Sequence, residues 1–213
     1  MKALGELGDT MVGATPTAYQ RESASAAQYI RAGDILENGS LASPSDGGVP
    51  TRGRAARLKS DDVVVRGRGL PIAAKVTGSA EGAYPSNDVL LFRPDRSRVD
   101  AGYVAAFLNL PRTREALSAD SQGAALSRLS VQALGSVEIP LPPLETQRKI
   151  AALAECMEAE QRLLDRLREL RRQLNQQILQ RLLGNAHDEG GNPRRGSHQA
   201  DHPKGDRSVL TSK

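Results

Sequence analysis

The chain has 213 residues, a length that fits one domain with an extension or two small units. Its 29 Lys and Arg residues slightly outnumber its 25 Asp and Glu residues, which permits a polyanionic partner without requiring one. A single cysteine excludes a disulfide framework and a cysteine-based metal site, and it favours a reducing cytoplasm. No apolar run approaches the roughly eighteen residues of a membrane span, so we expect a cytoplasmic protein with no membrane partner.

Residues 1–143 show the pattern of an α+β domain, with short strands separated by turns. The segments QYIRAGDIL, DDVVVRGRG and NDVLLFRPD each combine a short apolar run with turn residues. The segment SVEIPLP alternates Val137, Ile139 and Leu141 on one side, which is the period of a half-buried strand.

Helices are predicted between the last two of these strands. Asp100 is placed to cap a helix that carries an apolar stripe, and Pro111 should break this helix before a second piece over Arg112–Ala119. A brief helix at SVQALG has Ser130 placed to cap it and Gly135 to stop it.

Residues 144–184 are predicted to form one long, coiled-coil-type helix. Neither proline nor glycine occurs from Leu144 to Leu183, and a helix from Glu145 to Leu183 would be about 58 Å long. Its apolar residues recur by three and four around gaps at Glu160 and Arg171, in a stripe wider than a two-stranded seam. A domain of this size cannot cover such a helix, so we expect other subunits to contact Leu153, Met157, Leu163, Leu164, Leu167, Leu170, Leu174 and Ile178.

Residues 185–213 are polar and rich in glycine, proline and charge, which predicts a disordered tail. All three histidines, His187, His198 and His202, lie in this tail, so the folded part has none for acid–base work or metal ligation. No phosphate-binding or dinucleotide-binding glycine motif occurs. We therefore predict no catalytic and no metal-binding residues, and a chain that is not an enzyme.

The local surplus of positive charge lies between Pro50 and Lys75. Arginine binds guanine through two hydrogen bonds or neutralises phosphate, and glycines allow close approach of the backbone. Asp61 and Asp62 are adjacent in an expected strand, so they point to opposite faces and form no acid–base pair. The cluster predicts DNA contact through Arg52, Arg54, Arg57, Arg66, Arg68 and Lys75.

The junction between the domain and the helix carries a recognisable motif. The segment IPLPPLETQRKIA, followed by a leucine-rich helix that ends in ILQRLLG, resembles the specificity subunits of type I restriction–modification systems. The segments GDTMVGATPT, YIRAGDILENGSL and RLKSDDVVVRGRG resemble earlier parts of their target recognition domain, and the similarity extends from about Leu4 to Leu183.

The resemblance implies a non-catalytic reader of double-stranded DNA. Residues 1–143 would be a target recognition domain, and residues 144–184 would pair with another helix and dock on N6-adenine methyltransferase subunits. Those subunits would use S-adenosylmethionine, and a restriction subunit that joined them would use ATP and Mg²⁺. The chain itself would bind no cofactor.

Two departures from the family pattern affect this prediction. The family usually carries two recognition domains and two long helices, whereas this chain has one of each, so it resembles a half-length subunit. Such a chain would form a homodimer or pair with another half-length subunit, and it would read one half of a bipartite target. A non-catalytic interaction module and a decayed fragment of a longer subunit remain alternatives. The loop Gly123–Arg128 also departs from the family pattern, which leaves its DNA role open.

Overall fold

The computed structural model describes residues 1–15, 27–48, 50, 56–120 and 128–189. Contacts divide the chain into two units, Met1–Asp165 and Arg166–Lys213. The predictions for Arg52, Arg54 and residues 190–213 lie outside the described residues. In the part of the chain that is described, no helix is long and apolar enough to cross a membrane. The predicted fold class is confirmed, because a mixed α/β domain is followed by a long helix.

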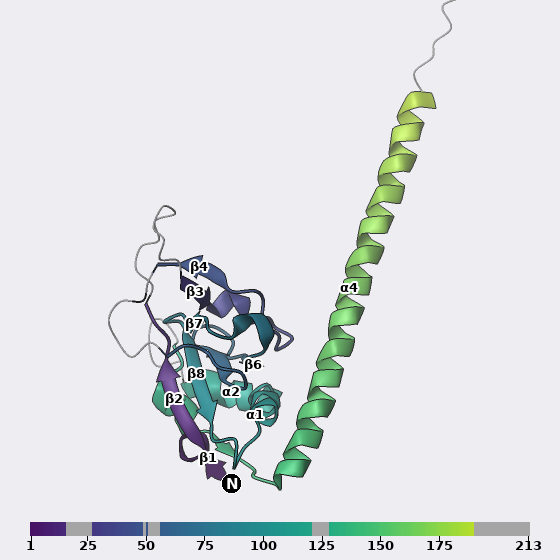
Figure 1. Cartoon of the computed structure of the whole chain (residues 1–213). Helices are drawn as coiled ribbons and strands as arrows, with labels where there is room; N and C mark the ends of the chain where they lie inside the picture. Colours follow the sequence, from purple (N-terminus) through teal and green to yellow (C-terminus); the bar gives the residue numbers. More distant parts are fainter. Residues whose placement is uncertain (16–26, 49, 51–55, 121–127, 190–213) are drawn as a thin grey trace, which may run out of the picture. The chain divides into compact units, whose positions relative to one another are not determined.

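The largest sheet among the described residues has four antiparallel strands in the order β2 (Gly8–Val12), β8 (Val89–Pro94), β5 (Val63–Arg66) and β6 (Ala73–Lys75) (Figure 1). Their register places Val64 opposite both Leu91 and Ala74. The predicted strands at DDVVVRGRG and NDVLLFRPD are therefore confirmed, and they lie side by side at the centre of the sheet.

Both faces of this sheet are buried, which explains the three consecutive valines. Successive side chains of a strand point to opposite faces. Val63 and Val65 belong to one apolar cluster, together with Phe92 and the residues of the helical layer. Val64 belongs to a second cluster on the other face. All three valines are at most 1% exposed.

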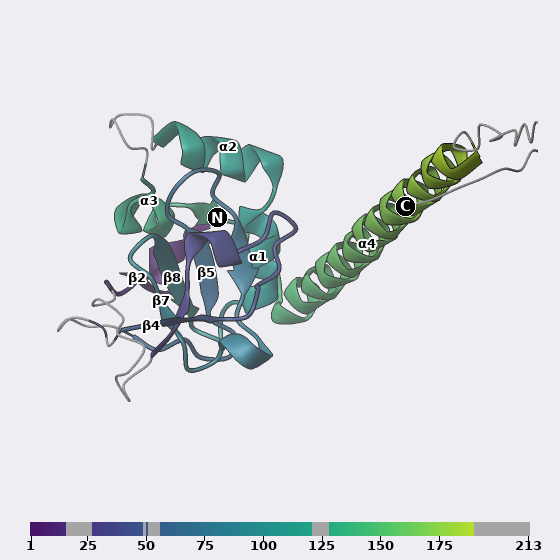
Figure 2. The ribbon, with the colours of Figure 1, turned by 90° about the horizontal axis from the view of Figure 1, so that it is seen from above.

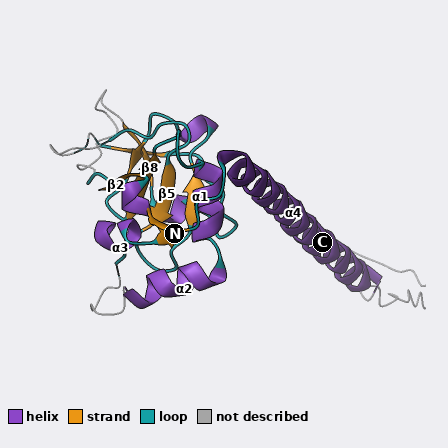
Figure 3. Cartoon of the chain, turned by 90° about the horizontal axis from the view of Figure 1, so that it is seen from below, coloured by secondary structure: helices purple, strands orange, loops and turns teal. Residues whose placement is uncertain are grey.

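Helices cover one face of the sheet and a smaller sheet covers the other (Figures 2 and 3). The helical layer contains α1 (Ala101–Leu108), α2 (Pro111–Asp120) and α3 (Val131–Gly135). The predicted caps are confirmed, because the Asp100 side chain accepts from Tyr103 N and the Ser130 side chain accepts from Ala133 N. Pro111 separates α1 from α2, as predicted.

The smaller sheets join segments that are distant in the sequence. In the first, β3 (Ala27–Ile30) lies between β4 (Ser45–Gly47) and β7 (Tyr84–Pro85) and is parallel to β7. In the second, β1 (Lys2–Ala3) pairs with β9 (Glu138–Ile139). The described residues also include three 3₁₀ turns, η1 (Leu4–Glu6), η2 (Ala32–Asp34) and η3 (Gly78–Ala80).

The placement of Asp61 and Asp62 in a strand is wrong, because both precede β5 in a turn where Asp61 has a φ of 63°. Asp62 is 2% exposed and accepts two hydrogen bonds from the Arg93 guanidinium, at 2.8 and 2.7 Å. These hydrogen bonds raise the pKa of Arg93 above its usual value. Asp62 also accepts from Lys59 N. The carboxylate therefore fastens the turn to β8, a contact 31 residues away in the sequence.

The long helix α4 extends over Leu144–Glu189, which at 1.5 Å per residue is about 69 Å. It starts where predicted, directly after Pro142 and Pro143. It ends later than predicted, because residues 185–189 of the expected tail are helical. A single glycine such as Gly184 costs a helix only about 1 kcal/mol, which is too little to stop it.

Gln147 attaches the first turn of α4 to the domain. Its side chain is fully buried. The carbonyl oxygen accepts from Asp100 N at 2.9 Å, and the amide nitrogen donates to Pro142 O at 2.8 Å and Arg98 O at 3.3 Å. One turn later Ala151 packs on Gly102 so closely that a Cβ on this glycine would lie 2.9 Å from the Ala151 Cβ. The first turns of α4 thus belong to the compact unit.

We predict that Gln147→Ala lowers the free energy of unfolding by about 2–3 kcal/mol, because buried backbone groups lose their hydrogen-bond partner. Urea denaturation of the full chain measures this loss. Thr146→Ala, one residue away and exposed, is the control and is expected to change stability by less than about 0.5 kcal/mol. Equal effects of the two substitutions would contradict the anchoring role of Gln147.

Candidate functional site

The fold separates the basic residues that are neighbours in the sequence. Arg57 precedes β5, and its backbone oxygen accepts from Arg93, near the end of β8. Arg68 follows β5, where Gly67 N donates to Asp88 O just before β8 begins. Because β5 and β8 are antiparallel, Arg57 and Arg68 lie at opposite ends of this strand pair. The described members of the predicted cluster therefore do not form one patch.

Arg57 is exposed but has partners within the domain. Its Nη1 donates to Gly82 O at 3.1 Å, and its guanidinium carbon lies 4.8 Å from the centre of the Tyr84 ring. A cation over an aromatic face is held by the electrostatic field of the ring. Arg57 therefore presents a partly fixed positive charge at this end of the strand pair.

Arg66 has a structural partner. Its guanidinium is half-buried and donates through Nε to Ile35 O at 2.7 Å, and Nη2 donates to the same oxygen. Ile35 is fully buried in the second apolar cluster. The side chain therefore satisfies a carbonyl that lies 31 residues away.

Lys75 also has a partner within the chain. Its ammonium forms an ion pair with Glu155 of α4. Burial lowers the pKa of Lys75, but the hydrogen bond and charge of Glu155 outweigh it and hold this pKa above its usual value. Lys75 thus keeps its charge and directs it at α4.

Arg68 and Arg128 form the basic pair that the fold brings together. The two residues are joined by an antiparallel β-bridge, and Leu129 N donates to Gly67 O at 2.9 Å. Both side chains are exposed, and the Arg128 guanidinium donates to the backbone oxygen of Asn87. In the sequence Arg128 lies 60 residues from Arg68, at the end of the segment Gly123–Arg128. Only the β-bridge therefore identifies the two arginines as neighbours.

Two glycines shape the turn that presents Arg68. A Cβ on Gly67 would lie 2.8 Å from Asp88 O, and Gly69 has a φ of 72°, a conformation that favours glycine. The predicted strand-end turn at RGRG is thus present. It places an exposed arginine where the backbone is also open to a ligand.

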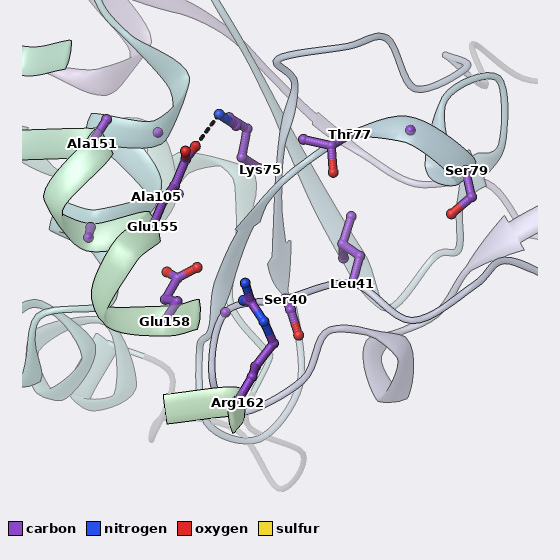
Figure 4. Close-up of a pocket in the computed structure, with 14 residues that line it drawn as sticks. Ser40, Leu41, Lys75, Thr77, Ser79, Ala105, Ala151, Glu155, Glu158 and Arg162 are labelled. Atoms are coloured by element: carbon purple, nitrogen blue, oxygen red, sulfur yellow. Dashed lines mark hydrogen bonds and ion pairs between the residues drawn. The ribbon is translucent and has the colours of Figure 1, made fainter. Parts of the chain in front are cut away.

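A groove of about 600 Å³ lies between the domain and the first turns of α4, within the unit Met1–Asp165 (Figure 4). The Lys75–Glu155 ion pair spans its wall. Burial raises the pKa of the neighbouring Glu158 above its usual value. Among the described residues no group of three or more His, Cys, Asp or Glu side chains could hold a metal ion. The groove thus carries charges of both signs, of which Lys75 and Glu155 are paired.

The second candidate surface is the apolar face of α4. The eight residues predicted to contact partners are between 41% and 72% exposed. Ile150, Leu179, Leu182 and Leu183 are also exposed and extend the apolar surface. Exposed apolar side chains that recur along one helix are typical of surfaces that bind another protein, so the interface at these residues stays a prediction.

The two candidate surfaces are therefore an exposed arginine pair on a mixed α/β domain and an uncovered apolar face on the helix that follows it. The family model for the type I restriction modification DNA specificity domain matches residues 1–182, and the chain belongs to this family. No curated protein sequence matches the chain.

Solved structures have the same fold. A chain from a study of complex assembly and conformational transition in a type I R-M system matches with a TM-score of 0.63 and 23% identity, over 94% of this chain and 50% of that one. The HsdS subunit from Thermoanaerobacter tengcongensis matches with a TM-score of 0.57 and 24% identity, over the same shares. The type I S subunit from M. genitalium matches with a TM-score of 0.50 and 14% identity, over 83% and 43%. This chain thus spans about half the length of the first two solved chains.

We predict that Arg66→Met lowers the free energy of unfolding by about 1–2 kcal/mol, because the buried Ile35 carbonyl loses its donors. Arg68→Met removes the same charge from an exposed side chain and is expected to change stability by less than about 0.5 kcal/mol. Urea denaturation compares the two variants. A larger loss for Arg68→Met would reverse the roles given to these residues.

Proposed function

We propose that this chain is the DNA specificity subunit of a type I restriction–modification complex and reads one half of a bipartite target. The observation that carries the proposal is the family match, which covers both the domain and most of the helix. The chain covers 50% of the solved HsdS chain. In this proposal a second copy or another half-length subunit supplies the other half-site. In this proposal the chain catalyses no reaction itself.

The DNA contacts are proposed for the exposed arginines. Arg68 and Arg128 present two guanidiniums from one bridged turn, a geometry suited to a guanine edge or to neighbouring phosphates. Arg57 offers a third positive charge from the other end of the strand pair. Arg52 and Arg54 remain proposed contacts from the sequence alone. Arg66 and Lys75 are left out of the interface because both are half-buried, with the Arg66 guanidinium on the Ile35 carbonyl and the Lys75 ammonium paired with Glu155, whereas Arg57 and Arg128 are exposed.

The apolar face of α4 is proposed as the assembly surface. One part would pair with a second specificity chain, and the rest would dock N6-adenine methyltransferase subunits that bind S-adenosylmethionine. A restriction subunit that uses ATP and Mg²⁺ would join the same complex. The complex would act in the cytoplasm, where its DNA substrate lies.

We predict that deleting the gene removes one two-part adenine-methylation motif from the genome, and that complementation restores it. Single-molecule methylation mapping of genomic DNA reads this directly. The control is a strain that expresses the methyltransferase subunit without this chain. An unchanged map in a strain that expresses both would contradict active recognition and would favour a decayed fragment or a structural module.

We predict that the Arg68→Ala, Arg128→Ala double variant weakens DNA binding by the assembled complex by at least about tenfold and reduces its salt dependence. Titration of labelled duplex DNA at several salt concentrations measures both. A double control, Arg96→Ala with Arg112→Ala, removes the same charge from two exposed side chains outside the proposed contacts. If the control weakens binding as much as the Arg68 and Arg128 double variant does, the effect is one of net charge and Arg68 and Arg128 are not the contact.

A further inference from the structure

The turn between β7 and β8 lies beside the Arg68–Arg128 pair. Gly67 N donates to Asp88 O at 2.8 Å, and the Arg128 guanidinium donates to the backbone oxygen of Asn87. Arg128 itself is joined to Arg68 by the β-bridge. Three segments that are distant in the sequence thus meet at the end of the sheet where β5 ends and β8 begins. A ligand that contacts both arginines therefore lies next to this turn.

The turn keeps its shape through contacts that do not involve the Asn87 side chain. Ser86 is 4% exposed, its N–H donates to Ile30 O at 2.8 Å, and its backbone oxygen accepts from Val89 N at 2.9 Å. The Ser86 hydroxyl donates to the carboxylate of the half-buried Asp88. The backbone that carries Asn87 is therefore fixed on both sides.

Asn87 itself carries a carboxamide with no structural task. The residue is exposed, and its carboxamide has no hydrogen-bond partner among the described residues. Asparagine is common in turns because it tolerates a positive φ and bonds to nearby backbone. Neither reason applies to Asn87. In the part of the chain that the structure describes, Asp61 is the one non-glycine residue with a positive φ, and the side-chain hydrogen bond within the turn joins Ser86 to Asp88. The fold therefore leaves the Asn87 amide available to a ligand.

We propose that Asn87 is a base-reading residue, which recognises an adenine in the major groove beside the DNA groups that Arg68 and Arg128 contact. A carboxamide accepts from N6 of adenine and donates to N7 at the same time, which is the pairing that asparagine makes with DNA. A guanidinium only donates, so it suits guanine or phosphate instead. The three side chains thus give one surface two different base preferences.

The geometry places this adenine close to the base pair that Arg68 contacts. The segments of Arg68 and Asn87 are neighbours through the hydrogen bond from Gly67 to Asp88. Neighbouring segments of a β-ladder lie about 4.8 Å apart, and successive bases of one DNA strand lie about 3.4 Å apart along the helix axis. The positions read by Asn87 and Arg68 are therefore expected within about two base pairs of each other.

The inference rests on the proposed function, because a base reader needs a chain that binds DNA. It goes further by assigning one position of the half-site to one side chain. Arg128 supports this role, since its guanidinium lies on the Asn87 backbone oxygen and places a positive charge beside the carboxamide. That charge attracts the phosphate backbone and brings the base edge within reach of the amide.

A panel of duplexes tests the assignment. The complex of this chain with its methyltransferase subunits is titrated with duplexes in which each base pair of the half-site is replaced in turn. Asn87→Ala is expected to reduce discrimination by at least about tenfold at one A·T position and to retain it elsewhere. Arg68→Ala locates the neighbouring position. The control, Gln132→Ala, removes an exposed carboxamide from α3 and is expected to retain discrimination at every position.

The outcomes of this titration separate the inference from the proposed function. Asn87→Ala with unchanged discrimination at every position would overturn the inference and leave the proposed function intact. Asn87→Ala with no specific binding at all would assign the residue to folding or assembly, and would also overturn the inference. A wild-type complex that binds every duplex equally would overturn the inference and the proposed function together.

The isosteric variant Asn87→Asp separates base reading from a role in the shape of the turn. Aspartate keeps the size of the side chain and the backbone contacts, but its carboxylate only accepts hydrogen bonds. The donor that a carboxylate reads in the major groove is N4 of cytosine. The preferred base at the Asn87 position is therefore expected to change from adenine to cytosine in the same titration. A retained preference for adenine would overturn the inference.

Discussion

The hydrogen bonds of Gln147 are the constraint on which the rest of the structure depends. Its carboxamide joins the first turn of α4 to Asp100 and to the carbonyls of Arg98 and Pro142. The Asp100 side chain in turn caps α1, the helix that packs on the central sheet. Because a buried carboxamide must satisfy both its donors and its acceptor, it fixes where α4 begins and which of its faces meets the domain. The uncovered apolar face follows from that orientation.

Local features of the chain are predictable from the sequence because they depend on neighbouring residues. The caps at Asp100 and Ser130, the break at Pro111 and the strand at Val63–Val65 need only side chains a few positions away. The turn at Asp61 and Asp62 is not predictable in this way. Its geometry depends on Arg93, which neutralises the buried Asp62 from a strand 31 residues later. The helix α4 also ends later than the sequence predicts, because one glycine is a weak signal for ending a helix.

The same distinction between features set by neighbouring residues and features set by distant contacts applies to the candidate site. Exposure of the leucines on α4 follows from periodicity and from the lack of enough domain to cover them. The basic residues that are neighbours in the sequence do not form one patch in the fold. Arg57 and Arg68 lie at opposite ends of the β5–β8 strand pair, and the Arg66 guanidinium donates to the Ile35 carbonyl. Arg128 becomes the neighbour of Arg68 only through a β-bridge between distant segments. Proximity in sequence identifies candidate charges, but the sheet register decides which of them act together.

The compact unit extends through the first turns of α4 to Asp165, rather than stopping at the prolines before the helix. The side chains of Gln147 and Ala151 are therefore part of the domain core, although they belong to the helix by backbone conformation. A chimaera that exchanges the globular domain between related chains keeps these contacts only when the junction falls inside the helix, beyond the residues that touch the domain. A junction at the prolines would join a domain to a helix whose first turns evolved against a different surface.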